Sequence, residues 1–174
     1  MFRRLANTGL SRINVHKPVL KGYIRSITDV VSGSSVGQGV EDRTFVTGYG
    51  DHAFQVNDCL VRDSVVLLPE SYFIWKARTF EEITLDSLSV FTALFPTIEM
   101  VIIGCGERVP AMLDPKIVTE MRNKGIVVEL MNSSSALTTF NVLNSEGRNV
   151  GAAIIPIKGY DPLQGQDAEE LKLE

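Results

Sequence analysis

"IEMVIIGCGERVPAMLDPKIVTEMRNKGIVVELMNSSSALTTFNVLNSEGRNVGAAIIPI", residues 98–157, alternates short apolar runs with segments whose apolar residues recur at helical spacing. Short apolar runs have the length of buried strands, and the longer periodic segments indicate amphipathic helices. We expect, in order, a strand at 98–103, a helix at 114–125, a strand at 126–131, a helix at 133–147 and a strand at 150–157. This alternation favours parallel pairing with right-handed crossovers.

Both predicted helices in this stretch carry boundary signals. Asp114 is a good N-cap, Pro115 fits the first turn, and Gly125 can end the first helix. A serine is expected to cap the second helix. The order of elements in the second half of the chain therefore follows from its own sequence.

The preceding part of the chain, from about residue 43, shows strand signals instead. We expect strands at 43–50, 53–57, 64–69 and 72–77, and a helix at 84–95. Gly50-Asp51 supplies the turn of a hairpin, Thr84 is the expected N-cap of the helix, and Pro96 ends it. The predicted fold class is mixed α/β, with a β-rich first half packed against the strand–helix–strand–helix–strand half.

Charge and composition divide the 174 residues into unlike parts. Residues 1–28 hold six basic and no acidic side chains, which is typical of a mitochondrial presequence. Residues 29–42 are rich in glycine and serine and indicate a flexible linker. We expect one globular domain at 43–158 and a flexible acidic tail at 159–174.

A basic arm that binds nucleic acid is the alternative interpretation of residues 1–28. The rest of the chain argues against it, because all 21 acidic residues lie beyond this segment and would repel a polyphosphate. No apolar run approaches the ~18–20 residues that a membrane-spanning helix needs. Cys59 and Cys105 form no CxxC pair, and we expect two buried thiols in a reducing compartment.

The turn Gly104-Cys105-Gly106 raises the question of a dinucleotide site, because it follows a strand and Glu129 stands where a ribose-binding acid would be expected. Against this, Val109 replaces the third glycine of the motif. The next helix cap, Asp114, lies well beyond the turn, so we expect no helix end aimed at it. We interpret Gly104 and Gly106 as a structural turn, and we expect no catalytic, cofactor-binding or metal-binding residues.

Three segments carry a family resemblance: "FQVNDCLVRDSVVLLPESYFIWKA", "VIIGCGERV" and "MRNKGIVVELMNSSSALTTFNVLNSEGRNVGAAIIP". In this order they resemble the family of mitochondrial respiratory complex I assembly factor 3 and its small single-domain prokaryotic relatives. The resemblance covers roughly Phe45 to Pro156. It implies a three-layer β+β/α domain with no established active site or cofactor.

The resemblance also implies a function. It implies a non-enzymatic matrix protein, peripheral to the inner membrane, that binds early intermediates of the peripheral arm of complex I and a second assembly factor. Tyr72 and Trp75 are candidate partner-binding residues, because tyrosine and tryptophan often anchor interfaces. Arg108 is a candidate because it could pair with an acidic partner. For Trp75 a place in the core is an equal alternative, and for Arg108 an ordinary solvated side chain is the alternative. A small-ligand or redox role at Gly104-Cys105-Gly106 is the alternative function.

Overall fold

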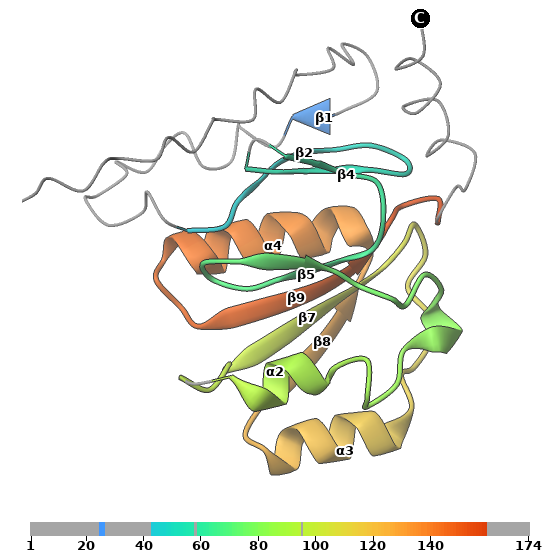
Figure 1. The fold of residues 1–174 in the computed structure, drawn as a ribbon. Coiled ribbons are helices and arrows are strands. Elements are labelled where there is room, and N and C mark those ends of the chain that lie inside the picture. The colour runs from blue at the N-terminus through green and yellow to red at the C-terminus, as the bar shows by residue number, and fades with distance from the viewer. Residues whose placement is uncertain (1–24, 27–42, 58, 95, 160–174) are drawn as a thin grey trace, which may run out of the picture.

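The computed structural model describes residues 25–26, 43–57, 59–94 and 96–159 (Figure 1). The predicted linker, most of the predicted presequence and nearly all of the predicted tail lie outside these residues. The elements are β1 (Arg25–Ser26), β2 (Val46–Tyr49), β3 (Phe54–Val56), β4 (Cys59–Val61), β5 (Val65–Leu67), β6 (Tyr72–Ile74), η1 (Phe80–Glu82), α2 (Ser89–Ala93), β7 (Met100–Cys105), α3 (Pro115–Asn123), β8 (Val127–Met131), α4 (Ser133–Ser145) and β9 (Val150–Ile155).

The strands form two sheets. Sheet A has the order β1-β2-β3-β4, with antiparallel neighbours throughout. Sheet B has the order β6-β5-β9-β7-β8. Within sheet B, β7 pairs in parallel with β8 and with β9, as the alternating stretch predicts, whereas β5 pairs antiparallel with β6 and β9.

Sheet B is the middle layer of the domain (Figure 1). On one of its faces lie α4 and, beyond that helix, sheet A; α2 and α3 cover the other face. Each face has its own apolar cluster. Phe140 of α4 belongs to the cluster on the first face, and Phe91 of α2 belongs to the cluster on the other face. Strand β9 is buried at every residue because both faces are covered, which explains its continuous apolar run. The predicted mixed α/β class is confirmed.

The helix expected at 84–95 is shorter than predicted: α2 covers only Ser89–Ala93. Thr84 and Ser87 hydrogen-bond each other's backbone instead, with the Ser87 N–H donating to Thr84 Oγ1 over 3.2 Å and the Thr84 N–H to Ser87 Oγ over 3.0 Å. Hydroxyl side chains that bond nearby backbone groups compete with regular helix, so an irregular turn replaces the predicted first turn.

The predicted boundaries of α3 are observed, whereas the predicted cap of α4 is not. Asp114 caps α3 by accepting the Lys116 N–H over 2.9 Å, and Gly125, beyond the end of α3, has a φ of 78°, as the sequence indicates. The serine cap expected for α4 is wrong, because the N-cap is Asn132, whose Oδ1 accepts the Ser135 N–H over 2.8 Å. Asparagine reaches this donor as well as serine does, so the sequence did not decide between neighbouring cap residues.

Two buried asparagines of α4 hold sheet A in place. The Asn141 side chain accepts the Val46 N–H over 3.0 Å and donates to the Val46 carbonyl over 2.8 Å. Asn144 donates to the Thr44 carbonyl over 2.8 Å, and Arg43 donates to Asn144 Oδ1 over 2.9 Å. The Asn141 amide thus replaces a neighbouring strand for one residue of β2. Without it, two buried backbone groups would lack partners.

The C-terminal end of the described residues is hydrogen-bonded to the loop of the β2–β3 hairpin. The Lys158 N–H donates to the Asp51 carbonyl over 2.9 Å, and the Lys158 ammonium lies 2.7 Å from the Asp51 carboxylate. His52, in the same hairpin loop, places Nδ1 2.9 Å from the Gly159 carbonyl. The last described residues therefore run beside sheet A.

We expect Asn141→Ala to lower the free energy of unfolding by about 2–4 kcal/mol, because it leaves the Val46 N–H and carbonyl buried without partners. Urea unfolding followed by circular dichroism measures the change. Asn123→Ala, at an exposed position near the end of α3, is the matched control and should stay within about 0.5 kcal/mol of the wild type. Equal effects of the two substitutions would contradict the bridging role of Asn141.

Candidate functional site

The two glycines of the 104–106 segment have different roles. Gly106 has a φ of 85°, a conformation that favours glycine, and it begins the turn. Gly104 lies inside β7, so its predicted place in the turn is wrong. A Cβ on Gly104 would come within 2.9 Å of Ile154 Cδ1 and 3.1 Å of Ala136 Cβ. A side chain at position 104 would therefore require both Ile154 and the start of α4 to shift.

A helix end does lie beside this turn, contrary to the sequence-based expectation. It is the N-terminus of α4, which follows β8, and not that of α3. The Ser133 N–H donates to the Gly106 carbonyl over 2.8 Å, and the Gly106 N–H donates to Ser133 Oγ over 2.8 Å. Ser133 Oγ also donates to the Ile155 carbonyl. One buried serine thus joins the ends of β7 and β9 to the start of α4.

These bonds occupy several of the donors that a phosphate group would need. Helix N-termini bind anions through free backbone N–H groups. At α4 the Ser133 N–H is bonded to Gly106, and the Ser135 N–H is bonded to Asn132. Glu129, the candidate ribose ligand, is exposed in the middle of β8, opposite Ile102. The geometry gives no support to a dinucleotide site at this turn.

The two cysteines differ in exposure. Cys59 is exposed in β4, so the expectation of two buried thiols is wrong for it. Cys105 is half-buried, and burial raises the pKa of its thiol to about 11. A neutral thiol is a poor nucleophile and a poor metal ligand. Among the described residues, no group of three or more histidine, cysteine or acidic side chains is placed to hold a metal ion.

The loop that follows Gly106 carries the first candidate interaction surface. We call residues 107–112 the β7 loop. Arg108, Val109 and Met112 are all exposed on it, and Met112, at 67% exposure, is the most exposed large apolar side chain of the described residues. An arginine beside exposed apolar side chains is a composition typical of interfaces. The sequence named Arg108; it missed Met112, because exposure cannot be read from an apolar residue in a loop.

Strand β6 carries the second candidate surface. It is an edge strand of sheet B, and Phe73 and Ile74 are 52% and 59% exposed. Trp75, a predicted anchor, is only 4% exposed, and its Nε1 donates to the Ser87 carbonyl over 2.9 Å. Trp75 therefore belongs to the core, which was the alternative interpretation. The exposed apolar surface is formed by Phe73 and Ile74, the two residues before it.

Tyr72, the predicted anchor that lies on β6, is half-buried. A hydrogen bond with the Cys59 side chain, then burial, then the Cys59 charge raise the pKa of the Tyr72 hydroxyl. Tyr72 also packs against the apolar cluster that α4 and sheet A share.

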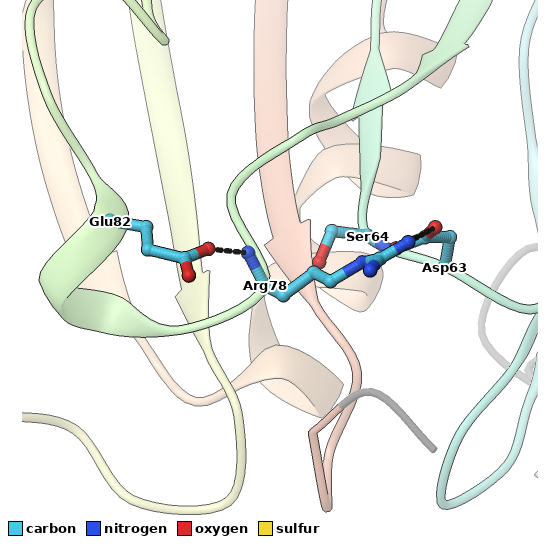
Figure 2. A network of polar contacts seen from close by, with 4 residues as sticks. All are labelled: Asp63, Ser64, Arg78 and Glu82. Atoms are coloured by element: carbon cyan, nitrogen blue, oxygen red, sulfur yellow. Dashed lines mark hydrogen bonds and ion pairs between the residues drawn. The ribbon is translucent and has the colours of Figure 1, made fainter. Parts of the chain in front are cut away.

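A polar network fixes the base of the β5–β6 hairpin (Figure 2). Arg78, which follows β6, pairs with the Asp63 carboxylate over 2.9 Å, and the backbone N–H of Arg78 donates to Glu82 over 2.7 Å. Asp63 also accepts the Ser64 N–H over 2.9 Å just before β5 begins. The two ends of the hairpin are thus joined by side chains as well as by the strand ladder. Ser64 Oγ is buried and has no hydrogen-bond partner among the described residues.

Alkylation tests the protonation state of Cys105. In a Cys59→Ser variant, the rate of reaction with iodoacetamide should rise about tenfold per pH unit from about pH 7 to 9.5, because the thiolate fraction keeps growing below a pKa of about 11. In the urea-unfolded chain the rate should level off near pH ~8.5–9. Since the unfolded chain loses this proton first, the contribution of Cys105 to stability falls as pH rises toward 11. A plateau below about pH 9 in the folded protein would show an activated thiol.

Comparison with known proteins places this domain among relatives. Residues 46–155 match the family model described as "Protein of unknown function (DUF498/DUF598)". A Bos taurus protein named NADH dehydrogenase [ubiquinone] 1 alpha subcomplex assembly factor 3 is 38% identical over 70% of this chain. The match spans 66% of the bovine protein, a little under two thirds of its length. An uncharacterized Rhodobacter capsulatus protein is 30% identical over 67% of this chain and 88% of its own.

The solved structures agree with the fold. A crystal structure of a Bordetella parapertussis protein is similar with a TM-score of 0.61 and 30% identity, over 66% of this chain and 96% of that one. The matching family model covers sheet B, its helices and most of sheet A. The chain belongs to the DUF498/DUF598 family.

Proposed function

We propose that this protein is a non-enzymatic assembly factor of mitochondrial respiratory complex I. It binds early intermediates of the peripheral arm together with a second assembly factor, and it works in the matrix, peripheral to the inner membrane. The observation that carries the proposal is the similarity to the bovine protein that bears this name, which covers 70% of this chain. None of the helices in the described residues is long and apolar enough to span a membrane.

The geometry of the domain supports binding in place of catalysis. The Gly106 N–H at the glycine turn is bonded within the fold, and burial keeps the Cys105 thiol beside it neutral. The β7 loop and the edge strand β6 instead carry exposed apolar side chains. Such groups contribute binding free energy when a partner covers them.

We assign the complex I partner to the β7 loop. Its root is fixed by the bonds between Ser133 and Gly106, so Arg108, Val109 and Met112 are presented from a rigid base. A rigid base lowers the conformational entropy that binding costs. Arg108 supplies a cation for an acidic partner, and Met112 supplies a flexible apolar contact.

Removing this protein from its source organism should reduce assembled complex I on native gels and leave the other respiratory complexes unchanged. Returning the wild-type chain should restore complex I. Unchanged complex I after removal would refute the proposed function.

The β7 loop is tested in the same system. Returning Arg108→Glu/Met112→Asp should fail to restore complex I, and the variant should retain complex I subunits about 30-fold more weakly in affinity purification, as expected for loss of an interface anchor. The matched control is Val127→Asp. Val127 is also exposed and apolar, but it lies at the start of β8, at the end of the sheet away from the β7 loop, so this variant should restore complex I. Full restoration by the loop variant would assign the partner to another surface.

A further inference from the structure

The outer edge of β6 has the features of a sheet edge that pairs with a strand of another chain. In the part of the chain that the structure describes, β5 is the only strand paired with β6. Exposed sheet edges usually carry charged side chains, since unpaired backbone groups invite association. Here the edge carries Phe73 and Ile74, both more than half exposed.

The hydrogen bonds of the β5–β6 hairpin show which backbone groups face outward. The Leu68 N–H donates to the Ser71 carbonyl over 2.8 Å, and the Trp75 N–H donates to the Ser64 carbonyl over 2.7 Å. Residues that bond to the neighbour and residues that do not alternate along an antiparallel pair. The backbone N–H and C=O of Tyr72 and Ile74 therefore point away from β5, toward the open edge.

The residues around this edge have similar chemistry when read in either direction. The segment 70–76 is "ESYFIWK", with an exposed acid at Glu70, an exposed base at Lys76 and Phe73 in the centre. An antiparallel copy centred on Phe73 would place Tyr72 opposite Ile74 of the partner subunit. The same alignment brings Glu70 to the level of Lys76 of the partner subunit, and the symmetric pair forms as well.

Only this register satisfies both the backbone and the charges. Hydrogen bonding from Tyr72 and Ile74 allows shifts of two residues at a time. A shift in one direction would place Glu70 opposite Ile74 of the partner subunit. A shift in the other would place Lys76 opposite Tyr72 of the partner subunit. Charge complementarity therefore selects the alignment centred on Phe73.

The side chains fit this alignment on both faces. Phe73 is in register with Val66, whose cluster includes Phe91 of α2, and it borders an open groove of about 580 Å³ that Val90 also lines. Residues opposite each other in a non-hydrogen-bonded pair lie closest, so the two Phe73 rings would meet beside these grooves. On the other face, Ile74 would contact Tyr72 of the partner subunit.

We propose that two copies of this protein associate through β6, in an antiparallel register centred on Phe73, so that their five-stranded sheets become continuous. The interface is isologous, with the same surface on both copies. It uses an edge strand and not the β7 loop, so a complex I partner on that loop does not compete with it directly.

Sedimentation velocity of the full chain over about 1–300 µM tests the proposal. The high concentrations are needed because an interface built on one three-residue strand buries little area and gives weak association. The wild type should show a monomer–dimer equilibrium. Phe73→Lys places two ammonium groups together on the two-fold axis and should weaken association at least about tenfold. Val127→Lys, at the other edge of sheet B, is the matched control and should leave association unchanged. A wild type that stays monomeric throughout this range would overturn the proposal.

A charge exchange tests the register with substitutions of exposed side chains only. Glu70→Lys alone, or Lys76→Glu alone, places like charges opposite each other twice and should weaken association about 3- to 10-fold. The double variant Glu70→Lys/Lys76→Glu restores opposite pairs and should return to within about twofold of the wild type. Glu70 lies in the turn before β6 and Lys76 lies after β6, so the two positions are at opposite ends of the strand and do not pair within one copy. Dimers that ignore these single substitutions, or that the double substitution does not rescue, would exclude this register.

Discussion

The arrangement of the whole domain depends on α4, which lies between the two sheets. Its apolar residues pack on sheet B, and its buried asparagines hydrogen-bond the backbone of β2 and Thr44. Sheet A therefore docks on α4 through a shared apolar cluster and through two buried asparagines that are hydrogen-bonded to backbone groups. Buried amides with all partners in place define one geometry, because any other position of β2 would leave backbone groups unpaired. The position of sheet A on α4 is therefore fixed by these bonds.

Much of sheet B could be predicted from the sequence, because its order of elements is written in local patterns. Asp114 and Gly125 mark the ends of α3 through local chemistry, and the parallel pairing of β7 with β8 follows from the helix between them. The short α2 was not predictable in the same way. Thr84 and Ser87 favour a helix start by residue type, but their hydroxyls instead bond each other's backbone.

The candidate surfaces were harder to predict, because exposure is a property of the finished fold. Phe73 and Trp75 lie two residues apart in one segment with strand-like sequence, yet Trp75 is buried and Phe73 is half exposed. The difference depends on the position of α2 and on the absence of a described strand beyond β6. The same applies to Ser133, whose residue type indicates a cap, whereas its observed role is to join three elements.

The Ser133 junction separates the scaffold of sheet B from the loop that begins at Gly106. Every group bonded to Ser133 belongs to a strand end, a turn residue or the helix start, and none belongs to residues 107–112. Insertions, deletions and substitutions in that loop therefore leave the strand ends undisturbed. We therefore expect changes within residues 107–112 to alter what this surface binds without loss of the bonds between Ser133, Gly106 and Ile155.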